Sequence, residues 1–150
     1  MDLKFNGQER VPAALPKVWA FINDPQRVAS CLPEVEDIAV HDPRNFDATV
    51  RVAVGPVRGK FKFKIQLDPQ ADGRHIVLKI GGGGFGSVVD LTANAELTDN
   101  GDASTTLDWN ASATMRGPVA TVGGRVLDAQ AQRVISTTFA NVKAKLTEAA

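Results

Sequence analysis

The sequence predicts an α+β domain, in which a curved antiparallel sheet of about seven strands carries two short helices and one long C-terminal helix. Two observations support this prediction. Over most of residues 2–115, apolar and polar residues alternate with a period of two, which is typical of strands with one wet face. From Pro118 onward the period changes to three and four, which is typical of a helix lying on another surface.

The chain is expected to form a single domain over residues 1–150, because it shows no repeat, low-complexity tract or linker. A domain of this size hides roughly 70% of the surface of its unfolded chain, which allows a core with a cavity. The longest apolar run falls well short of the roughly 20 residues that span a bilayer. The sequence therefore predicts no membrane-spanning segment.

The strand assignments follow from which residues share a face. The segment KFKFKIQL, residues 60–67, is the clearest case, because phenylalanine, isoleucine and leucine alternate with lysine and glutamine. Turn sequences such as DPQADG at 68–73 and TDNGD at 98–102 imply antiparallel neighbours in meander order. The other strands are expected at 2–11, near 34–40, and over 46–54, 75–80, 87–97 and 104–115.

Two short helices are expected between the first and second strands. In ALPKVWAFIN, residues 14–23, the apolar side chains stand at helical spacing. The next helix begins with Asp24 as its N-cap and Pro25 at its first helical position.

The C-terminal helix is expected to start at Pro118 and to continue for about 30 residues, or about 45 Å. Gly123 and Gly124 would then lie inside it, where each costs about 1 kcal/mol relative to alanine. Two interpretations of these glycines stay open: a groove for an extended apolar ligand, or tight packing of the helix on the sheet.

The stretch KIGGGGFGSVVD contains the pattern G-x-G-x-x-G at Gly81, Gly83 and Gly86. A phosphate-binding loop needs a following helix, whose N-terminal amides hold the anion. Here the following residues, 87–97, have the alternation of a strand. We therefore expect a glycine hairpin with a bulge, in which Phe85 at the tip is either a turn plug or an entrance residue.

Composition excludes several classes of function. Seventeen basic and seventeen acidic residues cancel, so no overall field favours nucleic acid. Cys31 is the single cysteine and Met1 is not followed by a signal sequence, so we expect a cytoplasmic protein without disulfides. His41 and His75 have no metal-site spacing and no nucleophile partner, so no metal or catalytic site is predicted. Cys31 is interpreted as a small buried residue.

Charged residues on the strands raise two further questions. Glu9 falls on the apolar face of the first strand, and Arg10 points the other way. A carboxylate there would either hydrogen-bond a ligand or sit at the sheet margin in water. Lys60, Lys62 and Lys64 are interpreted as a solvated face, with partner docking as the alternative.

Many of the inward positions are small. A curved sheet that faces a helix across short side chains tends to leave a gap, because larger residues would be needed to reach native packing density. Larger residues, including Phe61, Phe63, Trp109 and Met115, would line or close this gap. The small inward residues include Ala48, Val50, Val52, Val89, Leu91, Ala93, Thr105, Ala111 and Ala113.

This order of elements resembles the helix-grip fold of START-type lipid-transfer proteins, birch-type pollen allergens and polyketide cyclases. Four blocks further resemble the CoxG family of carbon monoxide dehydrogenase subunits. One departure is Glu34, where related chains often have glycine after Cys-Leu-Pro. The blocks are VWAFINDPQRVASCLPEVEDI (18–38), VAVGPVRGKFKFKIQL (52–67), GGGGFGSVVDLTANAEL (81–97) and MRGPVATVGGRVLDAQAQRVISTTFANVKAKL (115–146).

The resemblance implies a non-catalytic accessory protein of a molybdenum CO dehydrogenase or related hydroxylase, without a covalent cofactor. It also implies a cavity holding menaquinone, another isoprenoid or a lipid, and a place at the inner face of the membrane, peripherally or through a tail absent from this chain. The residues expected to contact the ligand are Phe46, Val50, Val52, Phe61, Phe63, Ile80, Phe85, Val89, Leu91, Trp109, Ala111, Met115, Val122 and Val126.

Two other functions remain open on the sequence. A polyketide cyclase or dehydratase would need an inward acid–base pair, for which Glu9 is the one candidate. An assembly factor would act by protein contact alone and would need no cavity.

Overall fold

The computed structural model describes residues 1–148 and has one seven-stranded antiparallel sheet with the order β1-β7-β6-β5-β4-β3-β2. The predicted fold class is confirmed, and the connections from β2 to β7 form a meander. The elements are β1 (Asp2–Val11), α1 (Leu15–Ile22), α2 (Pro25–Cys31), β2 (Val35–Asp42), β3 (Asn45–Val54), β4 (Val57–Pro69), β5 (His75–Gly84), β6 (Ser87–Asp99), β7 (Thr105–Arg116), the 3₁₀ helix η1 (Pro118–Val122) and α3 (Gly124–Glu148).

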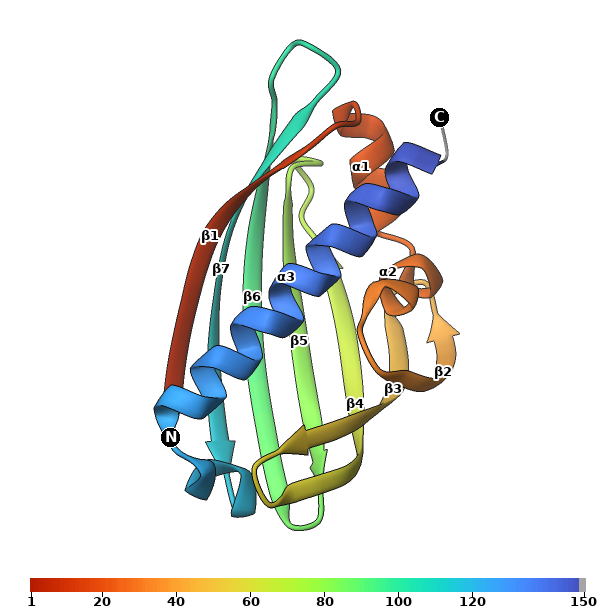
Figure 1. Ribbon diagram of the computed structural model, residues 1–150. Coiled ribbons are helices and arrows are strands. Elements are labelled where there is room, and N and C mark those ends of the chain that lie inside the picture. The colour runs from red at the N-terminus through yellow and green to blue at the C-terminus, as the bar shows by residue number, and fades with distance from the viewer. Residues whose placement is uncertain (149–150) are drawn as a thin grey trace.

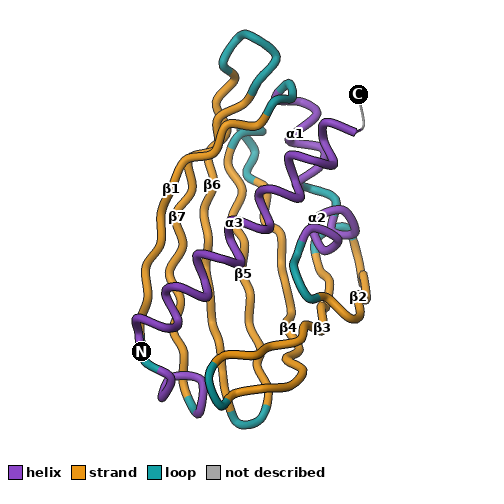
Figure 2. Tube along the Cα trace, in the orientation of Figure 1, coloured by secondary structure: helices purple, strands orange, loops and turns teal. Residues whose placement is uncertain are grey.

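All three α-helices lie on one face of the sheet (Figure 1). Helix α3 crosses this face diagonally, with α1 and α2 near its C-terminal half (Figure 2). Among the strands, its backbone comes closest to β1 and β3, which lie toward opposite sides of the sheet. None of the helices within residues 1–148 is long and apolar enough to cross a membrane.

The start of α2 agrees with the sequence prediction. The side chain of Asp24 accepts hydrogen bonds from the backbone N–H groups of Gln26 and Arg27, and Pro25 occupies the first turn. These bonds satisfy amide groups that have no partner inside the helix. Helix α2 is then tied to α3, because Asn141 Nδ2 donates to the Cys31 carbonyl at 2.9 Å.

The prediction of one helix from Pro118 is wrong in its first turn. Residues Pro118–Val122 form η1, and α3 begins at Gly124 and has 25 residues, or about 37 Å at 1.5 Å per residue. Gly123 separates the two with a φ of +102°, which residues with a Cβ rarely adopt. The glycines therefore stand at a junction and not inside a continuous helix.

The glycine hairpin is confirmed, but the expected bulge is absent, because β5 and β6 pair without a register shift from His75–Glu96 to Gly84–Ser87. β5 also runs four residues further than the predicted strand, to Gly84. A Cβ on Gly82 would lie 2.0 Å from the Lys62 carbonyl oxygen, so only glycine lets β5 pair with β4 here. The turn consists of Phe85 and Gly86, whose φ values of +54° and +81° have the sign that a type I′ turn requires.

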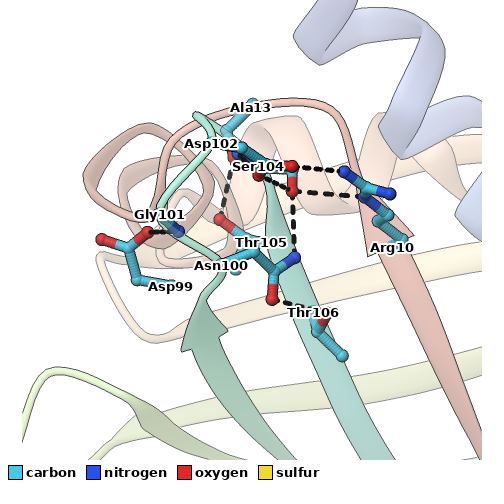
Figure 3. A network of polar contacts seen from close by, with 9 residues as sticks. All are labelled: Arg10, Ala13, Asp99, Asn100, Gly101, Asp102, Ser104, Thr105 and Thr106. Atoms are coloured by element: carbon cyan, nitrogen blue, oxygen red, sulfur yellow. Dashed lines mark hydrogen bonds and ion pairs between the residues drawn. The ribbon is translucent and has the colours of Figure 1, made fainter.

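The loop between β6 and β7 is held by a polar network at the opposite end of the sheet from the glycine hairpin (Figure 3). Arg10 Nη2 lies 2.6 Å from Asp102 Oδ2, and Arg10 Nε donates to Ser104 Oγ. Thr105 Oγ1 donates to the Ala13 carbonyl at 2.8 Å, which fixes β7 to the chain leading into α1. These bonds fix the long loop to the edge strand β1.

Candidate functional site

The helix-covered face of the sheet, here called the inner face, has its buried apolar residues in three separate clusters. One lies under α1 and the end of α3 and contains Val18, Phe21 and Leu146. A second lies under α2 around Phe46. The third lies near η1 around Leu127. The clusters therefore pack the two ends and one side of the inner face.

Between these clusters the inner face keeps partial solvent exposure. Leu91 and Ala93 of β6 point toward the helix side, belong to none of the three clusters and are only partly buried. Leu78 and Ile80 of β5 and Phe63 of β4, at the margin of the second cluster, are also only partly buried. A closely packed core would bury such side chains almost completely. The protein's own side chains therefore cover the apolar middle of the inner face only in part.

The fourteen predicted contact residues differ widely in burial. Phe46 and Phe61 are 1% exposed and belong to the packed core, whereas Phe85 and Val126 are 67% and 47% exposed. Ala111 is buried beside Phe5 of β1. The other nine are partly buried: Val50, Val52, Phe63, Ile80, Val89, Leu91, Trp109, Met115 and Val122.

The Phe85 ring lies over Gly59 of β4. A Cβ on Gly59 would come within 2.2 Å of this ring. Gly59 pairs with Val52 in an inward register, so Phe85 covers the inner face where β3 and β4 meet their hairpin. The ring is exposed at this margin and also covers Gly59, so both alternatives, a turn plug and an entrance residue, stay predictions.

Polar groups also reach the inner face. Lys143 Nζ of α3 donates to Glu9 Oε1 at 2.8 Å. Glu9 therefore has a partner within the protein. The sequence alone predicts either a ligand or water beside this carboxylate. The available signal was a lysine one position beyond Val142 in the apolar stripe of the terminal helix.

Trp109 brings an unpaired donor to the same region. Its Nε1 is buried and has no hydrogen-bond partner among the described residues. The indole lies against Gly7 of β1, where a Cβ would be 2.7 Å from the ring, and the ring centroid is 5.8 Å from that of Phe139. An unpaired buried N–H costs about 1–3 kcal/mol, which a polar ligand atom could offset.

A family model matches residues 7–147 of this chain, and it describes the CoxG subunit of carbon monoxide dehydrogenase. The chain belongs to the CoxG family. The match covers the inner face from Gly7 to Lys143 and agrees with the resemblance of the four sequence blocks. A comparison with curated proteins finds no match.

Solved structures show the same START-like fold as this CoxG-family chain. A conserved protein from Geobacillus kaustophilus superposes with a TM-score of 0.88 at 24% identity, covering 97% of this chain and 96% of its own. A START superfamily protein from Mycobacterium smegmatis has a TM-score of 0.76 at 12% identity, covering 98% and 99%. The Zhui aromatase/cyclase from Streptomyces sp. R1128 has 0.68 at 15%, covering 98% and 94%.

The outer face of this CoxG-family sheet is polar. It has open hollows of about 780 and 560 Å³, lined mainly by charged and amide side chains such as Lys64, Lys79 and Asp90. Lys60, Lys62 and Lys64 are exposed there, and Lys60 lies 3.2 Å from Glu36. This agrees with a solvated strand face and separates these hollows from the apolar inner face.

The remaining candidate groups are two surface histidines and one buried cysteine. His41 contacts Asp47 and His75 contacts Asp72, both on the surface. Residues 1–148 contain no cluster of three or more His, Cys, Asp or Glu side chains suited to a metal ion. Cys31 is buried, and this burial raises the pKa of its thiol, which disfavours the reactive thiolate.

Proposed function

We propose that this CoxG-family chain is an accessory protein of a molybdenum CO dehydrogenase-type hydroxylase and binds an apolar ligand between its sheet and α3. The ligand is a quinone such as menaquinone, or a lipid, and the protein links the enzyme to the membrane quinone pool at the inner face of the membrane. The observation that supports this most is the partly exposed apolar middle of the inner face, between the three clusters.

The chemistry of the inner face suits an isoprenoid quinone. Burial of an apolar tail stabilises a complex by about 25 cal/mol per Å², and Leu78, Ile80 and Leu91 supply an aliphatic surface for it. A quinone carbonyl accepts hydrogen bonds but cannot donate them. The unpaired Trp109 Nε1–H would gain an acceptor if the indole turned toward such a carbonyl.

A matched pair of variants tests binding on the inner face. Ala93→Phe places a ring in the middle of the inner face, whereas Thr92→Phe places it on the outer face of the same strand. Isothermal titration calorimetry with a short-chain menaquinone measures the affinity of each variant. Ala93→Phe should bind the menaquinone about tenfold or more weakly than the natural chain, whereas Thr92→Phe should bind it equally well. Equal affinities for both variants and the natural chain would contradict an inner-face site.

The link to a hydroxylase is tested with the same variants. Affinity capture with the subunits of a molybdenum CO dehydrogenase should retain the natural chain and Ala93→Phe alike, because docking uses the outside of the protein. Transfer of electrons to a quinone should then fail for Ala93→Phe alone. If transfer survives the filled inner face, the protein acts as an assembly factor by contact and not as a carrier.

A cyclase-like enzyme is the second candidate, and the Glu9–Lys143 pair favours it. The pair supplies the inward acid–base groups that such chemistry needs, and one structural neighbour is an aromatase/cyclase. Glu9→Gln separates the candidates, because a carrier should bind quinone with little change whereas a cyclase should lose turnover about 100-fold or more.

A further inference from the structure

Exposed apolar side chains are concentrated at one end of the molecule. This end, here called the turn end, consists of residues 54–60, 84–88 and 115–126, together with Met1 beside Met115. Figure 1 shows these turns together at the lower end of the sheet. Among the residues that the structure describes, four of the five large exposed apolar residues lie there: Met1, Phe85, Val88 and Val126, with Val40 as the exception.

The turn end is one continuous surface, because η1 joins the two hairpin turns. The backbone N–H of Val119 donates to Ser87 Oγ at 2.9 Å. A Cβ on Gly55 would lie 3.6 Å from Val122. Phe85 in turn lies over Gly59, so the tips of both hairpins and the start of α3 are held together.

Every charged residue in the three segments of the turn end is basic, although the whole chain has a formal net charge of zero. Lys60 lies near Glu36 and Arg116 near Asp90, but both basic side chains remain about two-thirds exposed. Arg58 and Arg125 are exposed and have no carboxylate within 4 Å among residues 1–148. This end therefore combines apolar tips with two arginines, Arg58 and Arg125, that no carboxylate among residues 1–148 neutralises.

We infer that the turn end docks the protein on an anionic phospholipid bilayer. Apolar and aromatic side chains partition into the headgroup region, and arginine side chains bind the phosphates around them. Charge complementarity favours this occupant, because the basic side chains of the turn end match the anionic headgroups. A bilayer also accepts scattered apolar tips without needing a matching shape. The inference rests on the proposed function for its purpose, since a carrier must meet the membrane that holds its ligand.

The opposite end of the sheet lacks this combination. Its loops hold Asp72, Asp99 and Asp102 in side-chain to backbone hydrogen bonds. Arg44 and Arg74 are exposed there, and they supply matched charge controls far from the turn end.

The test uses the full chain and ligand-free vesicles in a co-sedimentation assay. Vesicles of phosphatidylcholine with about 40% phosphatidylglycerol should bind the natural chain much better than vesicles of phosphatidylcholine alone. Arg58→Glu with Arg125→Glu should lower the partition coefficient by about 25-fold or more, since each arginine contributes about fivefold. Arg44→Glu with Arg74→Glu should leave it unchanged.

The apolar tips are tested separately with Phe85→Asn and Val126→Ser. Asparagine tolerates the positive φ of position 85, so Phe85→Asn should keep the fold. Its partition coefficient on anionic vesicles should nevertheless fall by about tenfold. Failure of the natural chain to prefer anionic vesicles, or equal losses in the two charge-reversal pairs, would overturn the inference. Because no quinone is present, this failure is distinct from failure of ligand binding.

Discussion

Lys143 on α3 and Glu9 on β1 form an ion pair of 2.8 Å between positions 134 residues apart in the chain. The pair joins the terminal helix to the edge strand of the sheet, on the inner face. Lys143 and Glu9 keep 36% and 29% of their side-chain surface exposed, so both charges remain partly hydrated. The pair should therefore add little to the free energy of unfolding, and its main effect should be to fix the position of α3 on the sheet.

A double-mutant cycle measures this pair. Lys143→Met alone should lower the free energy of unfolding by about 1 kcal/mol, because Glu9 loses its partner on an apolar face. Adding Glu9→Gln should restore most of that loss. Urea unfolding followed by circular dichroism gives the four values. Strictly additive losses would show that the two charges do not interact in solution.

Gly7→Ala should displace the indole of Trp109. The new Cβ would lie 2.7 Å from the ring, so the ring must move, at a cost of about 1–3 kcal/mol. In a Trp19→Phe background, Trp109 is the remaining tryptophan, and its fluorescence should shift to longer wavelength as it becomes hydrated.

Gly81→Ala is the matched control for this substitution. Its Cβ would meet Asp90 Oδ1 at 3.5 Å, an ordinary contact, so stability should change by less than about 0.5 kcal/mol. A Gly7→Ala variant with unchanged fluorescence would mean that the indole does not rest on β1.

The strands, the meander order of β2 to β7 and the two short helices could be predicted because each depends on local patterns. The pairing of β1 with β7 could not, because its partners are about 100 residues apart in the chain. Alternation in KFKFKIQL and the Asp24–Pro25 cap are visible in a few neighbouring residues. The Glu9–Lys143 pair and the Trp109 contact with Gly7 could not be predicted, because they depend on how the diagonal helix and the edge strand meet in space. Hydrophobic spacing also continues across Gly123, so it concealed the break between η1 and α3.

Gly123 and Gly124 should respond oppositely to alanine. Gly123 has a φ of +102°, so Gly123→Ala should lose about 1 kcal/mol or more. Gly124 lies in α3 with nothing within 4 Å of an added Cβ, so Gly124→Ala should gain about 0.4–1 kcal/mol by restricting the unfolded chain. Thermal unfolding of both variants checks the signs. Two losses of equal size would restore the idea that the helix must approach the sheet closely at both glycines.

His75 should make stability depend on pH near neutrality. The hydrogen bond to the Asp72 carboxylate raises the pKa of His75 above its ordinary value of 6.5, and Glu96 adds to the effect. Because the folded pKa is the higher one, this contribution is complete below about pH 6.5 and is lost as the pH rises through the raised pKa. The urea midpoint should therefore fall as the pH rises above about 6.5.

Asp72→Asn isolates the cause of this pH dependence. An amide oxygen at position 72 can still accept from the backbone N–H groups of Arg74 and His75, but it carries no charge to stabilise the imidazolium. The fall in the urea midpoint with rising pH should therefore shrink in Asp72→Asn and disappear in His75→Gln. A fall of the same size in His75→Gln as in the natural chain would assign it to another group, since His75 would then contribute nothing to the titration.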